Sequence, residues 1–269
     1  MELAYKKLGE GTPFIILHGL YGSSDNWYTI GKKLSTSYTV YLIDQRNHGQ
    51  SPHHPVHTYP ALQEDLYEFF NRLNISKVVL MGHSMGGKCA MLFALLHPEL
   101  IKELIIVDVA PRDYKNLTEY SSHAIEHLNI IQALHQIDLN QCKTRIEVEK
   151  QLALYIQNST LRQFLLKNLK IQNNLFSWKI NVEALSQNLP GIVSNIDISK
   201  IIIDKEKMKF SVLFVKGERS DYIRESDQNA IKQLFPKAQF TTIFDAGHWL
   251  HAEQPAAFIK TLLYFLENE

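Results

Sequence analysis

Six short apolar runs alternate with stretches of helical periodicity along this chain of 269 residues. The runs are rich in Val, Ile, Leu and Phe and lack a regular polar–apolar alternation, which is typical of strands buried on both faces of a parallel sheet. They lie at residues 14–17, 39–43, 78–81, 104–109, 212–215 and 240–244. Helices are predicted between them at residues 25–34, 60–73, 85–97, 225–235 and 254–266. This order predicts an α/β fold, in which helices cover both faces of a parallel sheet.

The alternation stops between residues 112 and 203, where strand signals are missing and apolar residues recur at helical spacing. Three helix faces are marked there, by Ile125, Leu128 and Leu134, by Val148, Leu152 and Tyr155, and by Leu161, Phe164 and Leu165. A compact domain does not contain so long a structureless loop. We therefore expect a sheet domain at residues 1–111 and 204–269, interrupted by a helical cap at residues 112–203.

Charge and cysteine content exclude several classes of protein. Lys and Arg together number 28, as do Asp and Glu, and no stretch concentrates basic residues, so nucleic acid is not an expected partner. The two cysteines, Cys89 and Cys142, are too few for a disulfide framework and lack the spacing of a zinc site. No segment reaches the length of a membrane span, and the first residues lack the apolar stretch of a signal peptide. We expect a cytoplasmic protein without a membrane span.

A glycine-flanked serine follows the third apolar run directly, in the string Gly82-His83-Ser84-Met85-Gly86. A pattern that fixes only two glycines and one serine also occurs by chance in unrelated chains, so the string alone could mark an ordinary turn. Here it stands between a predicted strand and a predicted helix, where a sharp turn exposes the serine hydroxyl. This context predicts Ser84 as an acyl-accepting nucleophile.

Two further segments follow predicted strands, and the carboxyl ends of parallel strands meet at one edge of a sheet. The loop after the first run can aim the N–H group of Leu20 at the same point as the N–H group of Met85, which predicts both as oxyanion donors. The segment after the last run contains His248, the candidate general base. His251 is the alternative base, although it lies nearer the helix and is expected to cap or pack.

Two aspartates could orient this histidine. Asp108 lies in the apolar run at residues 104–109, where a buried carboxylate needs a partner such as a histidine. Asp221 follows the run at residues 212–215 and could equally be a solvated turn residue. The residues alone leave both as candidates for the acid.

Five motifs in this order resemble those of the α/β-hydrolase superfamily and, more narrowly, its YbfF-like esterase branch. They are HGLYGS at residues 18–23, DQRNHGQS at 44–51, GHSMGGK at 82–88, DVAP at 108–111 and GHWLHAE at 247–253. The resemblance extends from about Leu3 to the C-terminus. The resemblance is weaker in the expected cap, where only residues 162–166 and 178–181 are similar to the family. It implies an α/β-hydrolase fold with a cap and no cofactor or metal.

The resemblance also bears on the acid. In much of the superfamily the acid lies three residues beyond the glycine that ends the penultimate strand. That glycine is Gly217 here, and the position holds Ser220, so this chain departs from the common pattern. In the YbfF-like branch such a departure accompanies an acid after the strand that follows the nucleophile helix. This implies Asp108 rather than Asp221, with Ser220 as a supporting hydrogen-bond partner.

Two groups of histidines could suggest metal sites, but their sequence context favours structural roles without a metal. An H-x-x-E-H string and a proline-containing loop carry them, at His123, Glu126 and His127 and at His53, His54 and His57. The H-x-x-E-H string lacks an evident third ligand. The proline-containing loop has no carboxylates or cysteines at a spacing that would complete a metal site. We expect a polar helix face and a solvated loop. For Asp44 and Arg46 we expect a salt bridge inside the loop that they open, without a catalytic role.

These residues together predict a serine hydrolase that cleaves a small-molecule ester or acyl thioester in two steps. His248 would deprotonate Ser84, and water would release the acid. Phe164, Phe176 and Trp178 are candidates to line the acyl pocket, although each could serve core packing. Two alternatives stay open, namely a carbon–carbon bond hydrolase with the same triad and a ligand receptor that keeps the pocket without catalysis.

Overall fold

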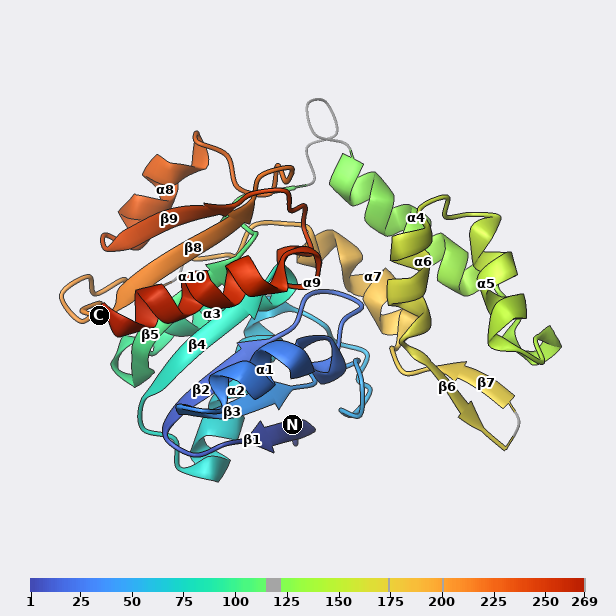
Figure 1. Ribbon diagram of the computed structural model, residues 1–269, viewed down its shortest axis with the longest axis horizontal. Coiled ribbons are helices and arrows are strands. Elements are labelled where there is room, and N and C mark those ends of the chain that lie inside the picture. Colours follow the sequence, from blue (N-terminus) through green and yellow to red (C-terminus); the bar gives the residue numbers. More distant parts are fainter. Residues whose placement is uncertain (115–121, 174, 200, 269) are drawn as a thin grey trace.

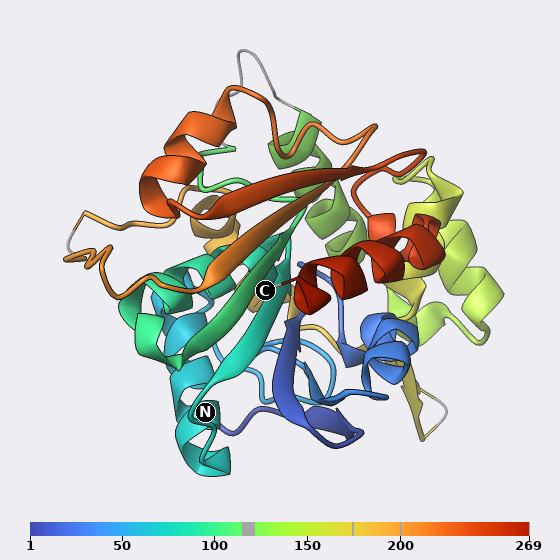
Figure 2. The same cartoon turned by 60° about the vertical axis from the view of Figure 1, so that its left-hand side comes forward.

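The computed structural model describes residues 1–114, 122–173, 175–199 and 201–268, and a seven-stranded sheet forms its centre (Figure 1). The strands stand in the order β1-β3-β2-β4-β5-β8-β9, and all are parallel except β1, which pairs antiparallel with β3. Their bounds are β1 Tyr5–Leu8, β2 Thr12–Leu17, β3 Tyr38–Ile43, β4 Val78–His83, β5 Ile101–Val107, β8 Ser211–Gly217 and β9 Ala238–Ile243. The strands twist strongly across the sheet (Figure 2). The predicted α/β fold is confirmed, whereas β1 was not predicted.

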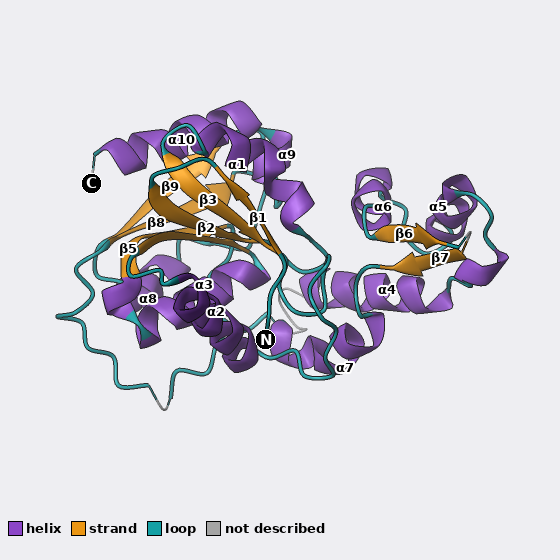
Figure 3. Cartoon of the chain, turned by 90° about the horizontal axis from the view of Figure 1, so that it is seen from below, coloured by secondary structure: helices purple, strands orange, loops and turns teal. Residues whose placement is uncertain are grey.

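Helices cover both faces of the sheet (Figure 3). One face carries α1 (Tyr28–Leu34) and α10 (Pro255–Glu267), and the other carries α2 (Tyr59–Leu73), α3 (Met85–Leu96) and α8 (Asp227–Leu234). Short helical turns complete this part of the chain: η1 (Ser24–Trp27), η2 (Pro98–Leu100) and α9 (Leu250–Glu253). In the described part of the chain, no helix combines the length and the apolar character needed to cross a membrane.

Successive residues of each central strand point to opposite faces, so one strand contributes to two cores. In β2, Phe14 and Ile16 join the core under α1 and α10, which contains Trp27. Ile15 and Leu17 join the other core, under α2 and α3. Burial on both faces explains why these strands appear in the sequence as continuous apolar runs.

The chain between β5 and β8 forms a separate group of elements beside the sheet (Figure 1). They are α4 (Ser122–Gln136), η3 (Leu139–Gln141), α5 (Arg145–Ala153), α6 (Ser159–Leu166), β6 (Leu169–Gln172), β7 (Leu175–Trp178) and α7 (Val182–Ile192). Three of the α-helices, α5, α6 and α7, begin at a residue whose side chain accepts a hydrogen bond from the first turn, at Thr144, Asn158 and Asn181. The expectation that this segment contains no strand was wrong. The β6–β7 hairpin is largely exposed and therefore has no buried apolar run.

The predicted helix faces of this segment are only partly right. Val148, Leu152, Leu161 and Leu165 are buried, but Ile125, Leu128 and Tyr155 are exposed. In α4 the buried side is instead centred on Ile130, Ile131 and Leu134. The prediction chose a stripe that left out the adjacent isoleucines, which define the apolar side of this helix.

The loop after β3 is held by partners outside itself, so the expected salt bridge between Asp44 and Arg46 was wrong. Arg46 pairs with Asp65 of α2, with Nη2 of Arg46 at 2.8 Å from Oδ1 of Asp65. Asp44 instead accepts hydrogen bonds from the N–H groups of Ser24 and Gln50. The loop is therefore tied to α2 by a buried ion pair.

Replacing Arg46 with methionine is expected to lower the free energy of unfolding by about 3 kcal/mol, because the buried Asp65 would lose both guanidinium hydrogen bonds and keep the Met1 amino group, at 3.2 Å, as a charged partner. Chemical denaturation measures this change. The matched control is Lys6→Met, which breaks the exposed Lys6–Asp25 pair and should cost less than about 1 kcal/mol. Adding Asp65→Leu to Arg46→Met should restore part of the loss. Equal effects of Arg46→Met and Lys6→Met would contradict the assigned role of the buried pair.

Candidate active site

Ser84 occupies a strained turn between β4 and α3. Its φ of 53° and ψ of −118° lie outside the regions that side chains favour. The flanking glycines are required by close packing: a Cβ atom on Gly82 would lie 2.2 Å from the carbonyl oxygen of Gly86, and one on Gly86 would lie 2.5 Å from that of Leu17. The turn lifts the serine clear of strand and helix.

The His248 imidazole and the Asp108 carboxylate are in hydrogen-bond contact. His248 lies between β9 and α9, and its Nδ1 is 2.8 Å from Oδ2 of Asp108, which follows β5 and is fully buried. The carboxylate also accepts hydrogen bonds from the Gly217 N–H group, at 3.1 Å, and from the Ser220 hydroxyl. The ring of Tyr222 stacks on the His248 ring at a centroid distance of 3.9 Å. Both partners of the pair are thus fixed by neighbours from β8 and its following loop.

Asp221, the alternative acid, points to a different histidine. Its Oδ1 lies 2.6 Å from Nε2 of His123 on α4, and its Oδ2 lies 3.4 Å from Nη2 of Arg224. Successive residues of an extended segment point in opposite directions, so Ser220 faces Asp108 while Asp221 faces the inserted segment. Geometry therefore favours Asp108 as the partner of His248.

Burial acts on both members of the pair. It lowers the pKa of His248 to well below the usual value, and nearby His123 lowers the pKa further. Burial raises the pKa of Asp108, while the Ser220 and Gly217 hydrogen bonds lower it. At neutral pH the imidazole of His248 is consequently uncharged, the form in which it can accept a proton.

The candidate oxyanion donors, Leu20 and Met85, line the smaller cavity together with Ser84. Met85 is the first residue of α3, so its N–H group has no partner one turn earlier in the helix. Leu20 follows β2 in a turn closed by a 2.9 Å hydrogen bond from Gly22 N–H to the Gly19 carbonyl. Two hydrogen bonds between Gln45 and His18 hold the start of this loop. Leu20 thus follows β2 and Met85 begins α3, and their role as oxyanion donors stays a prediction.

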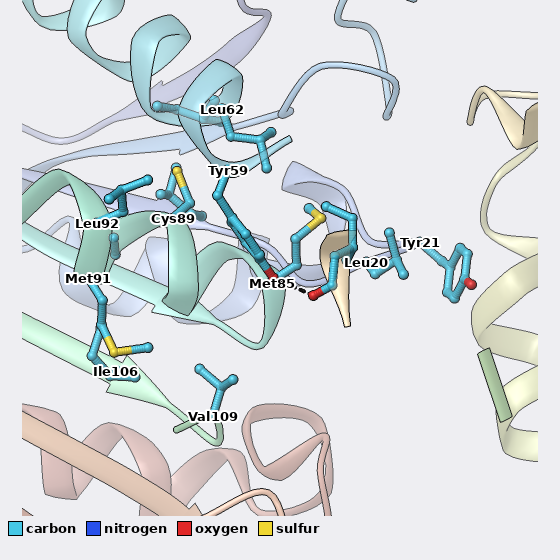
Figure 4. Packing of buried hydrophobic residues seen from close by; sticks show 14 of the residues in the cluster. Leu20, Tyr21, Tyr59, Leu62, Met85, Cys89, Met91, Leu92, Ile106 and Val109 are labelled. Atoms are coloured by element: carbon cyan, nitrogen blue, oxygen red, sulfur yellow. Dashed lines mark hydrogen bonds between the residues drawn. The ribbon is translucent and has the colours of Figure 1, made fainter. Parts of the chain in front are cut away.

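Two cavities meet at Ser84. The larger has a volume of about 160 Å³ and is lined by Ser84, His248 and Leu20, together with His251. The smaller, of about 30 Å³, is lined by Ser84, Met85 and Leu20 but not by His248. Figure 4 shows the side chains of Met85 and Leu20 beside Tyr59, close to the start of α3. Four of the five predicted site residues thus line one or both cavities, and Asp108 lies behind them in contact with His248.

Comparison with known families agrees with this arrangement. The family model for the alpha/beta hydrolase fold matches residues 12–255. The chain therefore belongs to this family. The predicted family membership is confirmed, and the parallel sheet with its serine turn after β4 is the family's fold in this chain.

Relatives of this α/β hydrolase carry names of ester-cleaving enzymes. A solved marine microorganism esterase is 47% identical, with a TM-score of 0.92 and coverage of 98% of this chain and 99% of that one. The sn-1-specific diacylglycerol lipase ABHD11 of Danio rerio is 40% identical, over 96% of this chain and 80% of its own length. Esterase YbfF of Escherichia coli is 31% identical, over 96% and 94% respectively.

The inserted segment of this α/β hydrolase contributes a polar wall to the larger cavity. His123, Glu126 and His127 of α4 all line it, so the expected polar helix face looks into the cavity rather than into solvent alone. Phe164 of α6 lines it too. Phe176 and Trp178, the other aromatic candidates, do not line either cavity and pack in the core instead.

The histidines of the loop after β3 have separate environments. His53 and His54 are exposed, as expected, but His57 is fully buried and its Nε2 lies 3.3 Å from the Sδ atom of Met85. The expectation of a solvated His57 was wrong. Within the described ranges, no group of three or more His, Cys, Asp or Glu side chains could hold a metal ion.

Three contacts of the site were not foreseen. The stacking of Tyr222 on His248 is one, and the pairing of His123 with Asp221 is another. The third is at His83, whose Nε2 lies 2.9 Å from the His248 carbonyl oxygen and so joins the end of β4 to the histidine loop. His251 packs, with its ring stacked on Trp27 at 4.0 Å. Tyr222 directly follows Ser220 and Asp221, and this adjacency was the available signal.

Proposed function

We propose that this α/β hydrolase is a serine hydrolase that cleaves carboxylic esters, or acyl thioesters, through an acyl-enzyme on Ser84. One observation carries the proposal: His248, whose Nδ1 lies 2.8 Å from Oδ2 of the buried Asp108, shares a cavity with a serine on a strained turn. The esterase and lipase names of the relatives support the same chemistry.

In the proposed mechanism the uncharged imidazole of His248 accepts the proton of the Ser84 hydroxyl as its oxygen attacks the acyl carbonyl. The N–H groups of Leu20 and Met85 stabilise the oxyanion. His248 then gives the proton to the leaving alcohol or thiol. Asp108 holds the imidazole in the correct tautomer and stabilises its charged form. In the second step His248 activates water, which releases the acid and regenerates Ser84.

We further propose that residues 112–203 act as a cap over the core formed by residues 1–111 and 204–269. The proposed boundaries fall in the connections between β5 and α4 and between α7 and β8. Support comes from α4 and α6, which supply part of the larger cavity's wall. The substrate is a small molecule. The unpaired thiols of Cys89 and Cys142 fit a reducing, cytoplasmic location.

Labelling with a fluorophosphonate probe tests the proposal. We expect one covalent adduct per chain, located on Ser84 by mass spectrometry, since the probe requires an activated serine. Ser84→Ala should abolish the adduct and the hydrolysis of p-nitrophenyl acetate. The matched control Ser159→Ala, which changes an exposed serine at the start of α6, should alter neither.

Other outcomes separate the alternatives. Folded protein that gives no adduct would refute the enzyme proposal and favour a ligand receptor. An adduct on Ser84 without turnover of any ester or thioester would favour the carbon–carbon bond hydrolase.

Removing the Ser220 hydroxyl should weaken the reaction without abolishing it. Ser220→Ala leaves Asp108 with the Gly217 N–H group and His248, and a lost hydrogen bond to a charged group is worth about 1.5–3 kcal/mol. We expect kcat for p-nitrophenyl acetate to fall by about 10- to 100-fold. The pH profile of kcat should shift as well, because this hydroxyl lowers the pKa of Asp108. Ser220→Thr keeps a hydroxyl and should recover most of the rate. An unchanged profile would contradict this role.

A further inference from the structure

The two cavities at Ser84 differ strongly in size. About 10–15 Å³ of such volume holds one water molecule, so the smaller cavity, of about 30 Å³, has room for about two water-sized groups. The larger, of about 160 Å³, is comparable to a cavity that holds a benzene ring. A substrate whose carbonyl carbon lies at Ser84 therefore finds unequal space on its two sides.

The chemistry of the proposed reaction assigns one side to each part of the substrate. The leaving group must lie beside His248, which gives it a proton, and His248 lines only the larger cavity. The oxyanion must face the N–H groups of Leu20 and Met85. The acyl group then takes the remaining direction, into the smaller cavity, which Met85 also lines.

Hydrogen bonds fix the wall of the smaller cavity that lies opposite Ser84. This wall includes Ile192 and Val193, at the C-terminal end of α7. The last carbonyl groups of a helix lack partners within it, and here the carbonyls at positions 192, 193 and 194 each accept a hydrogen bond from outside α7, with the donors to positions 192 and 194 in the sheet domain. The donors are, in order, the Tyr59 hydroxyl at 2.7 Å, the Tyr114 N–H group at 2.9 Å and the buried ammonium group of Lys88.

These hydrogen bonds oppose expansion of the cavity. Moving the wall outward would leave the Lys88 charge and the carbonyls of a helix end with fewer partners, and such groups are costly when buried. The wall therefore acts as a fixed stop for the acyl chain, rather than as a side chain that can rotate aside.

Resting on the proposed serine-hydrolase function, we infer that the site takes esters of short acyl groups, acetyl or propionyl, with the bulk of the substrate on the leaving-group side. Ile192 and Val193 set the limit of acyl length. Of the polar residues of α4, Glu126 lines only the larger cavity and faces the leaving group there, whereas His123 and His127 line both cavities.

The test is the chain-length profile of kcat/KM on p-nitrophenyl esters from acetate to octanoate. A methylene that does not fit costs at least about a factor of 10, so the value for hexanoate should lie at least about 100-fold below that for acetate. Ile192→Ala should raise the hexanoate-to-acetate ratio by about 10-fold or more. Val193→Ala is the second variant and should change the ratio in the same direction.

Ile130→Ala is the matched control, since Ile130 is buried and lines the larger cavity but not the smaller. It should leave the hexanoate-to-acetate ratio within about 2-fold and instead change the preference between p-nitrophenyl and 1-naphthyl acetate. Labelling of Ser84 with a wild-type profile that favours hexanoate or octanoate would overturn the inference and leave the proposed function intact. Absence of both labelling and turnover would overturn the proposed function itself.

Discussion

Asp108→Asn is expected to lower kcat for p-nitrophenyl acetate by a factor on the order of 10³ or more, whereas Asp221→Asn should leave it nearly unchanged. Both substitutions keep the size of the side chain and remove one negative charge. Only Asp108 contacts His248, at 2.8 Å. An amide there can hold the imidazole in the wrong tautomer and cannot stabilise the positive charge that develops in the transition state.

The two variants serve as controls for each other. Asp221 directly follows Ser220, whose hydroxyl contacts Asp108, but the carboxylate of Asp221 itself contacts His123 and Arg224. Steady-state rates and fluorophosphonate labelling rates should both fall for Asp108→Asn. Circular dichroism establishes that each variant is folded. A larger loss in Asp221→Asn would show that the later loop supplies the acid and that the Asp108–His248 pair has a structural role.

The parts of the fold that appear plainly in the sequence are those whose burial is uniform. β2 and β5 are buried on both faces over residues 14–17 and 104–107, and these parts form unbroken apolar runs. β1, with the sequence YKKL, lies at the edge of the sheet and alternates between exposed and half-buried residues. The β6–β7 hairpin is mostly exposed. Short strands of this kind lack a distinctive periodicity, so they were missed.

The site divides in a similar way. Ser84, Asp108 and His248 each follow a strand of a parallel sheet, so their order in the chain is enough to place them at one edge of that sheet. The stacking of Tyr222 on His248 and the burial of His57 against Met85 depend on contacts between distant loops. A histidine in a proline-containing loop has the same local sequence whether it is buried or solvated. Local patterns therefore could not reveal these contacts.

The second large effect that we expect is a loss of folding stability at acidic pH. Burial is the largest influence on six histidines and lowers the pKa of each well below its ordinary value of 6.5, to about 3 for three of them. They are His48, His57, His83, His127, His248 and His251. In the unfolded chain these residues take up protons as the pH falls below 6.5, but in the folded chain they do not.

The sign follows from linkage. A group whose pKa is depressed by folding contributes its full stability above its unfolded pKa, and this stability is lost as the pH falls below 6.5. Between pH 7.5 and 5.5 each such histidine costs roughly 1 kcal/mol, so the six together cost several kcal/mol. Asp108 acts in the opposite direction, because burial raises its pKa, and it offsets part of this loss. The net loss is a sizeable fraction of the whole stability of many domains.

We therefore expect cooperative unfolding between about pH 5 and 6, measured by circular dichroism and by a steep fall of Tm with pH. His57→Gln removes one buried imidazole and should reduce the dependence of unfolding free energy on pH by about 1.4 kcal/mol per pH unit at the acid end. His54→Gln, which changes an exposed histidine of the same loop, is the matched control and should leave the dependence unchanged. Because the variants differ by three positions, a general effect of the loop would appear in both. A chain that stays folded at pH 4.5 would show that water or structural relaxation lets these imidazoles take up protons in the folded state.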